Sequence, residues 1–286
     1  DALEICDDAV DNDCDGIEDA DCFGDVGLGF AHSCAVNLDG TLACWGDDGS
    51  GQATPPAGDF ETVSGGLSHS CGLDVTGAVE CWGDDGMGQS TPVAGTYSQV
   101  DAGYEHTCGV LDDASVACWG DDLAGQATAP AGDFLQVSSG GYSDCAHSCG
   151  VRADGTLECW GCDVAGCSLD DGQCNAPPGT FLSVSAGGGH NCALRDDGAI
   201  LCWGLNAEGQ ASVPGAVYVA VTAGEFHTCA IRANGVTLCW GLDADGQATS
   251  LVNDLDGIYA GGAHSCGLGA DDTLTCWGSD AAGQVK

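Results

Sequence analysis

The chain has 286 residues, and its 44 acidic side chains against four Lys and Arg give a formal net charge of −40. A surface this acidic repels nucleic acids and anionic lipids, so we exclude both as partners. The 21 cysteines indicate an oxidising compartment, and we expect a secreted or cell-surface protein. No apolar run is long enough to span a membrane. No leader precedes Asp1, so we expect that a signal peptide has been removed.

Residues 1–22 form an acidic, cysteine-containing segment that we separate from the rest of the chain. From Asp11 the sequence follows the D-x-D-x-D-G spacing of a calcium loop, in which alternate carboxylates converge on one cation and Gly16 permits a sharp turn. Cys22 stands where an EF-hand has its closing Glu, so this is not an EF-hand. The metal ligands that we predict are Asp7, Asp11, Asp13, Asp15 and Asp19.

The same segment resembles a short metal-binding motif of bacterial surface and secreted proteins, E-x-C-D-x-x-x-D-N-D-C-D-G. The matching residues are Glu4, Cys6, Asp7, Asp11, Asn12, Asp13, Cys14, Asp15 and Gly16. Because oxygen ligands favour Ca²⁺, calcium is the expected cofactor; the alternatives are copper or another metal, and a solvated acidic leader without metal. Cys6, Cys14 and Cys22 are an odd set, so we expect one of them to be free or to pair with another chain.

Residues 23–286 contain seven repeats with a period of about 37 residues, which is typical of a repeat architecture. Each repeat has His-x-Cys and then Cys-Trp-Gly, and all seven His and seven Trp of the chain lie in these motifs. A turn such as Asn234-Gly235 separates the two motifs and supplies the left-handed residues of a tight β-hairpin. In two repeats Ala114 and Asp272 stand where this Gly is expected.

The two cysteines of each predicted hairpin are ten residues apart. Alternation along the strands puts Cys34 and Cys44 on one face and opposite each other, at about 4.5–5.5 Å, which is within disulfide range. We therefore predict a disulfide in every hairpin, worth roughly 2–3 kcal/mol each; the alternative is seven pairs of buried thiols. The predicted pairs are Cys34 with Cys44, Cys71 with Cys81, Cys108 with Cys118, Cys149 with Cys159, Cys192 with Cys202, Cys229 with Cys239 and Cys266 with Cys276.

A short strand such as Phe60-Glu-Thr-Val63 precedes each hairpin, and a loop ending in Gly-Gln follows it. With Ala-Gly before the His, the Asp-Gly turn and Trp-Gly, this pattern resembles the repeats of the regulator of chromosome condensation family. The resemblance implies an all-β fold, a seven-bladed β-propeller over residues 23–286, and the doubled cysteines resemble its secreted bacterial branch. Because the chain ends soon after the last Gly-Gln, we expect the strand Phe23–Val26 to dock beside the last blade and close the ring.

The fourth repeat is irregular, with one insertion near Ser143 and a second between Cys162 and Cys174. In this second insertion Cys167 takes the place that we expect for the Gln. We expect the extra cysteines to pair as Cys167 with Cys174 and Cys145 with Cys162. Insertions in repeat proteins often mark a binding face, so this loop is either a contact site or a local elaboration.

Nothing in the sequence indicates an enzyme. There is no nucleophile next to a base and no Gly-rich phosphate loop, and seven His in register favour a packing role in which each imidazole bonds backbone. Nuclear members of the family bind chromatin and catalyse nucleotide exchange on a small GTPase. Fold alone does not carry function, so these activities do not follow from the resemblance. The acidic surface and the cysteine content argue against both of them here.

Our leading hypothesis is a non-enzymatic, extracellular structural or adhesive propeller that self-assembles into a surface appendage or layer. The assembly would use its acidic cysteine-containing leader and the seam at which the first and last blades meet. Its partner is then itself, as a homo-oligomer or polymer. The alternative is a secreted, inhibitor-like module that binds another extracellular protein on one face. Tyr104, Tyr142 and Phe226, each close before a His, are the aromatic candidates for that face. An enzyme is a distant third.

Overall fold

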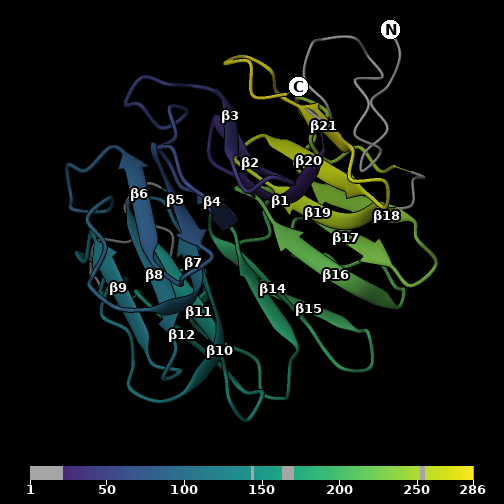
Figure 1. Cartoon of the computed structure of the whole chain (residues 1–286). Coiled ribbons are helices and arrows are strands. Elements are labelled where there is room, and N and C mark those ends of the chain that lie inside the picture. Colours follow the sequence, from purple (N-terminus) through teal and green to yellow (C-terminus); the bar gives the residue numbers. More distant parts are fainter. Residues whose placement is uncertain (1–21, 143–144, 163–170, 252–254, 286) are drawn as a thin grey trace, which may run out of the picture.

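The computed structural model describes residues 22–142, 145–162, 171–251 and 255–285. These residues form seven antiparallel sheets of three strands each, and the described part of the chain contains no helix. The sheets follow one another around a ring (Figure 1). The predicted all-β, seven-bladed propeller is confirmed.

Each blade takes three consecutive strands, which we call first, second and third, and the second strand lies between the other two. The strands are β1 (Phe23–Leu28), β2 (His32–Asn37), β3 (Leu42–Gly46), β4 (Phe60–Gly65), β5 (His69–Asp74), β6 (Val79–Gly83), β7 (Tyr97–Ala102), β8 (His106–Leu111), β9 (Val116–Gly120), β10 (Phe134–Gly140), β11 (His147–Arg152), β12 (Leu157–Trp160), β13 (Ser183–Ala186), β14 (His190–Leu194), β15 (Ile200–Gly204), β16 (Tyr218–Ala223), β17 (His227–Arg232), β18 (Thr237–Gly241), β19 (Leu255–Ala260), β20 (His264–Gly269) and β21 (Leu274–Gly278).

The hairpins form as the cysteine spacing predicts, and all seven predicted disulfides are present. In each blade the two cysteines lie opposite each other on the second and third strands, with Cα atoms 4.0–4.1 Å apart. This separation is slightly shorter than the 4.5–5.5 Å that we expected. The bonds join Cys34 with Cys44, Cys71 with Cys81, Cys108 with Cys118, Cys149 with Cys159, Cys192 with Cys202, Cys229 with Cys239 and Cys266 with Cys276.

The two members of each disulfide differ in burial. The cysteine on the second strand is 0% exposed in every blade, because this strand lies in the middle of its sheet. The cysteine on the third strand lies at the outer edge of the sheet and is only partly buried. These partly buried cysteines are Cys44, Cys81, Cys118, Cys159, Cys202, Cys239 and Cys276.

The hairpin turns require a left-handed residue, which Gly40 supplies in the first blade with φ of 83°. Ala114 and Asp272 adopt φ of 67° and 60° at the equivalent positions. They are the only non-glycine residues with positive φ in the described part of the chain. The fold therefore keeps the same turn even where the sequence lacks its glycine.

The first strand of a blade begins beside the hairpin turn of the same blade, and we call this end of the blade the lower edge. In six blades the register between the first and second strands shifts at the second residue of the first strand, which is a β-bulge. The bulge turns that residue out to solvent. In the fourth blade Phe134 is 1% exposed, whereas Leu135 beside it is 65% exposed.

The hydrophobic core lies between blades. In the first blade Phe23, Val26 and Trp45 project from one face and pack against Cys266 and Leu268 of the seventh blade. The opposite face of the first blade, with Cys34, meets the second blade in the same way. Every disulfide is thus covered by the aromatic face of the next blade, and each Trp side chain packs between two blades.

The ring closes at this seam, but not by a strand that joins the last sheet. β1 packs against the last blade but pairs with β2 in its own blade. Two backbone contacts link this end of the chain to the last blade: a β-bridge between Cys22 and Thr273, and a hydrogen bond from Phe23 N to Asp272 O at 3.0 Å. Gln284 makes further bonds here. Its carbonyl accepts the Ser33 hydroxyl and the Trp45 indole N–H, both at 2.9 Å. Seven hairpins have seven first strands, so no strand of the described chain is left over to complete a neighbouring sheet.

The disulfide of the fourth-blade insertion joins Cys162 to Cys174, so both pairings that we expected there are wrong. The expected Gln is also present: Gln173, not Cys167, fills that place, and its carbonyl accepts the Trp203 indole N–H at 2.9 Å. The bridge closes the base of the insertion and so returns Gln173 to the position that Gln takes in every other blade. Cys145 is disulfide-bonded as well, and Cys167 lies outside the described residues.

The predicted metal segment lies outside the described residues except for its last residue, Cys22, which is disulfide-bonded. The ligands that we predict, Asp7, Asp11, Asp13, Asp15 and Asp19, and the cysteines Cys6 and Cys14 therefore stay predictions, as does the boundary after residue 22. Within the described ranges no group of three or more His, Cys, Asp or Glu could hold a metal ion. No helix long and apolar enough to cross a membrane was found there either.

Candidate binding site

The seven His side chains form a closed belt of hydrogen bonds that crosses every blade boundary. Each His Nε2 meets a side chain of the next blade, a Ser or Thr hydroxyl in six cases and the Asn191 amide oxygen in one, and not the backbone that we expected. The pairs are His32–Ser70, His69–Thr107, His106–Ser148, His147–Asn191, His190–Thr228, His227–Ser265 and His264–Ser33, at 2.8–2.9 Å.

The belt fixes the protonation of its imidazoles. The Ser70 hydroxyl donates its one hydrogen to the carbonyl of Gln52, at 3.0 Å, so Nε2 of His32 must be the donor in their bond. Burial lowers the pKa of His106 to about 3, and it lowers the pKa of the other six as well. All seven His are therefore neutral at physiological pH, and their role is structural.

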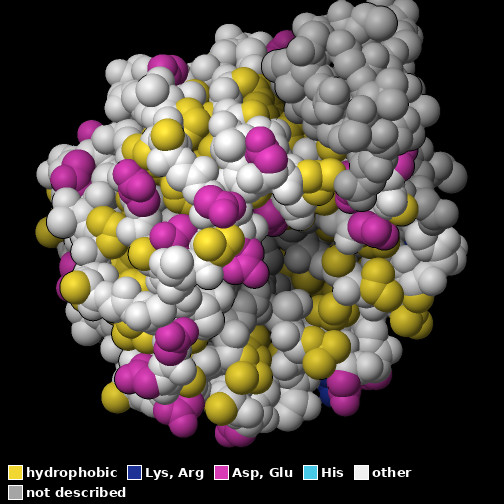
Figure 2. Space-filling view, viewed as in Figure 1, with side chains coloured by type: hydrophobic (Ala, Val, Ile, Leu, Met, Phe, Trp, Pro, Cys, Tyr) yellow, Lys and Arg dark blue, Asp and Glu magenta, His cyan; other side chains and the backbone are white. Residues whose placement is uncertain are grey.

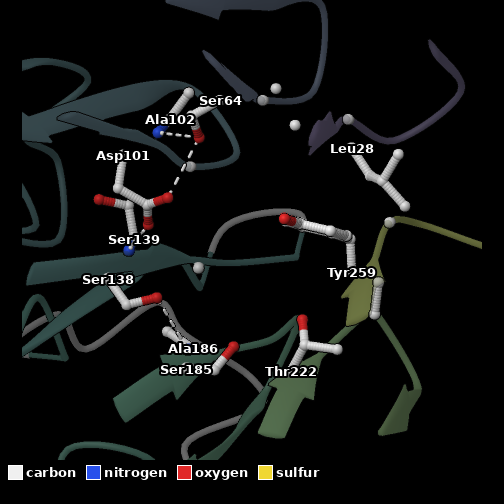
Figure 3. Close-up of a pocket in the computed structure, with 18 of the residues that line it drawn as sticks. Leu28, Ser64, Asp101, Ala102, Ser138, Ser139, Ser185, Ala186, Thr222 and Tyr259 are labelled. Atoms are coloured by element: carbon white, nitrogen blue, oxygen red, sulfur yellow. Dashed lines mark hydrogen bonds between the residues drawn. The ribbon is translucent and has the colours of Figure 1, made fainter. Parts of the chain in front are cut away.

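Inside the belt the first strands line a central cavity of about 520 Å³. Their third and fifth residues differ from blade to blade. Ser64, Asp101 and Ser138 occupy the fifth position in three successive blades, Ser185 takes the equivalent place in the fifth blade, and Tyr259 reaches in from the seventh (Figure 3). The Ser64 hydroxyl accepts Ala102 N at 3.0 Å, and Ser138 and Ser185 bond the next blade in the same way, so this polar lining is largely engaged in holding the blades together.

Two half-buried carboxylates belong to this lining. Asp101 accepts Ser139 N at 2.6 Å and the Ser64 hydroxyl at 3.1 Å, and burial nevertheless raises its pKa to about 6. Asp25 accepts Val63 N at 3.0 Å, and burial raises its pKa to about 6 too. The cavity is therefore anionic at neutral pH and loses charge in mild acid.

The upper mouth of the cavity, formed by the loops between first and second strands, carries aromatic side chains. The rings of Tyr142 and Phe226 meet edge to face with centroids 5.0 Å apart. They come from the fourth and sixth blades, and the loop between them, residues 187–189, is entirely glycine. Tyr104 lines the cavity beside them, and so does Glu225, whose pKa burial raises to about 7. The space-filling view shows a face hollowed at its middle, with acidic side chains around the hollow (Figure 2).

This arrangement suits recognition better than catalysis. Aromatic rings beside a desolvated carboxylate attract a cation through both the ring quadrupole and the charge. The structure brings together Tyr142 and Phe226, which the sequence marked only as aromatic candidates before His. Sequence reasoning missed Asp25, Asp101 and Glu225. The sequence does contain a signal that could have found these three residues: each occupies a position of the repeat at which the residue type changes from blade to blade.

The fold has several solved counterparts. The entire ectodomain of the receptor kinase CR4 from Physcomitrella patens superimposes with a TM-score of 0.74 and 26% identity, over 90% of this chain and 74% of that one. The CRINKLY WD40 ectodomain of the receptor kinase ACR4 from Arabidopsis thaliana gives 0.74 and 24%, over 93% and 98%. Prp20p from Saccharomyces cerevisiae gives 0.69 and 16%, over 86% and 83%. No curated protein sequence matches the chain significantly.

The repeat itself is matched by a family model described as the regulator of chromosome condensation (RCC1) repeat. The matches cover residues 25–52, 60–89, 97–126, 181–210 and 218–247, more than half of the chain. Eight disulfides between described cysteines indicate an extracellular protein. With seven blades of the expected order and this match, the chain belongs to the regulator of chromosome condensation repeat family.

Proposed function

We propose that the chain is a non-enzymatic extracellular module, secreted or displayed at the cell surface, that binds a protein partner at the upper mouth of its channel. The observation that carries this proposal is the ring contact between Tyr142 and Phe226. These aromatic side chains break the sevenfold repetition, and they adjoin a cavity large enough to accept side chains of a partner. Large, rigid aromatic groups are the usual anchors of protein interfaces.

The partner segment that suits this mouth is basic. Glu225 precedes Phe226 in the chain and lines the cavity, and burial raises its pKa because its charge is poorly solvated there. A Lys or Arg side chain would restore that solvation and would stack on a ring, which contributes about 0.5–2 kcal/mol. The net charge of −40 would also accelerate the encounter with a cationic partner.

A fluorescently labelled hexalysine peptide tests this site at 0.15 M salt. We expect Glu225→Gln to weaken binding by about tenfold and Phe226→Leu by about fivefold, as expected for the loss of about 1–1.4 kcal/mol. Glu80→Gln is the matched control, because it removes the same charge from an exposed position on the third strand β6, at the outer edge of its blade. Equal weakening by the two Glu variants would show that hexalysine only follows the overall charge, and would contradict the site.

A structural or adhesive role through self-assembly is a second candidate. It is favoured by the odd number of cysteines, 21, which cannot all pair with one another, and by the acidic leader with its predicted Ca²⁺ site. Native mass of the oxidised chain in calcium, then with chelator and then with reductant, tests this role. Assemblies that fall apart to 28.4 kDa would support it, and a 28.4 kDa species throughout would contradict it.

A further inference from the structure

All three arginines of this acidic chain gather at the lower edge of three consecutive blades. Arg152 and Arg232 are the last residues of β11 and β17, and Arg195 follows β14 directly. The equivalent residues of the other blades are Asn37, Asp74, Leu111 and Gly269. The arginines are therefore confined to blades four to six.

The same three blades expose apolar side chains beside these arginines. The bulge turns Leu135 and Val219 out to solvent, 65% and 58% exposed, and Leu182 directly before β13 is 63% exposed. Val217, 58% exposed, joins them because its carbonyl accepts Ala233 N next to Arg232. In the other blades the bulge residues are Gly24, Glu61, Ser98 and Asp256. We call the surface over blades four to six the arginine sector; it comprises Leu135, Arg152, Leu182, Arg195, Val217, Val219 and Arg232.

The arginines of this sector differ in how far the fold engages them. Arg152 is held, since it pairs with Glu158 and lies over the Phe134 ring at 4.7 Å. Arg195 has a side chain 38% exposed and only a distant carboxylate, Asp197 at 4.0 Å. Arg232 makes no ion pair with another described residue, and its buried Nε has no acceptor among them. The sector thus keeps cationic groups that the described fold does not neutralise.

The first and second blades carry the complementary surface at the same edge. Leu38 and Val75, 43% and 59% exposed, surround a shallow depression together with Asp39, Asp59 and Glu61. All three carboxylates are exposed, and no arginine lies in these blades. We call this surface the acidic sector.

We propose that two copies of the chain pair lower edge to lower edge about a twofold axis, each arginine sector covering the acidic sector of the other copy. In a ring of seven, blades one and two lie across the channel from blades four to six. A single twofold rotation therefore places the arginine sector of each copy over the acidic sector of the other. Such an isologous contact is self-complementary and closes at two subunits.

The composition of the surface favours a second copy as the occupant. Six of the eleven exposed large apolar residues in the described part of the chain lie in the two sectors, so exposed apolar side chains are concentrated at the lower edge. Apolar groups gathered on a surface with polar neighbours often mark a protein interface. Arginine with apolar neighbours is the usual chemistry of interface centres. At 0.15 M salt the Debye length is about 8 Å, so the local pairing of the sectors outweighs most of the repulsion between two chains of this charge. This dimer uses neither the upper mouth nor the leader, and it adds a defined surface to the assembly proposed above.

Sedimentation of the oxidised full chain at 0.15 M salt, with chelator present, tests the pairing. We expect a dimer, and we expect Leu182→Ser with Val219→Ser to weaken it by about tenfold or more. The matched control is Val93→Ser with Leu123→Ser, which changes two exposed apolar residues, 45% and 78%, outside both sectors. A monomer at 100 µM or so in the wild type, well above common dimer constants, or equal effects of the two double variants, would overturn the proposal.

A charge exchange separates pairing from loss of stability. Arg195→Glu with Arg232→Glu, and Asp59→Arg with Glu61→Arg, should each make the chain monomeric, because either change gives like charges in both halves of the contact. Mixing the two variants should restore a dimer, since each half then meets its opposite. Failure of the mixture to associate would overturn the proposal. An assembly that survives all lower-edge variants and falls to monomer only with chelator or reductant would instead assign association to the leader.

Discussion

The His belt and the channel lining are two concentric rings built by the same seven blades, and they follow opposite rules. In the belt every blade supplies His, a hydroxyl or amide group, and Gln, and every boundary has the same bonds. In the lining the fifth residue of the first strand is Gly27 in one blade, Asp101 in another and Tyr259 in a third. A group that recurs in all seven blades makes every side of the ring alike, so its role is to stabilise the ring. The residues that vary from blade to blade make the sides of the ring differ and so form its binding surfaces.

Acid should affect the two rings in opposite directions, and this is the largest effect that we expect. Six of the belt His have folded pKa values of about 3–4 against 6.5 when unfolded, and burial lowers the pKa of His147 as well. The unfolded chain therefore takes up their protons first, and stability falls as pH drops below 6.5. Asp25, Asp101 and Glu225 have raised pKa values of about 6 to 7, so they recover stability over the same fall. Between its folded and unfolded pKa values, each of these groups changes the unfolding free energy by about 1.4 kcal/mol per pH unit.

Seven His outnumber three carboxylates, so the net expectation is a loss of stability from pH 6.5 to 4. Guanidinium unfolding followed by Trp fluorescence at pH 7, 6 and 5 checks this, with a midpoint that falls at each step. A midpoint that rises on acidification would mean that relief of the −40 self-repulsion exceeds the cost of charging the belt.

Removal of a single belt group should cost more than removal of a lining group. His106→Ala leaves a cavity at a fully buried site and takes the imidazole partner from Ser148, so we expect a loss of about 2–4 kcal/mol. Thr222→Ala in the cavity lining is the control, and we expect it to change stability by less than about 0.5 kcal/mol. Equal losses in chemical denaturation would show that the lining holds the ring as firmly as the belt does.

The hairpin disulfides test the repeated part of the molecule at a smaller scale. Replacement of Cys108 and Cys118 by Ser should cost about 2–3 kcal/mol, because a ten-residue loop is released in the unfolded chain. The pair Cys162 and Cys174 closes a loop of similar length, twelve residues, in the irregular blade. The same replacement there should cost as much by chain entropy alone. A much smaller loss at the second pair would mean that the insertion is held by other contacts.

The sequence predicts the structural features that recur in every repeat. The hairpins, their disulfides and the seven blades follow from spacing, turn residues and strand alternation, which are local. Predictions that depend on how distant segments meet were less complete: the expected partner of Cys162 was wrong, and closure at the strand Phe23–Val26 left out the bonds of Gln284. The contact between Tyr142 and Phe226 could not be read from spacing either, because it crosses a whole blade.

The smallest effect that we expect concerns two turns that depart from the repeat. Ala114 and Asp272 hold left-handed backbone that glycine adopts at no steric cost, so Ala114→Gly and Asp272→Gly should each stabilise the chain by about 1 kcal/mol, less the entropy that glycine adds to the unfolded state. Gly155→Ala is the matched reversal, since its φ is 82° and an added Cβ would meet Thr180 only at an ordinary 3.4 Å. It should destabilise by a similar amount in the same denaturation experiment. If both glycine substitutions destabilise instead, the Ala114 and Asp272 side chains must make contacts that outweigh the strain of their turns.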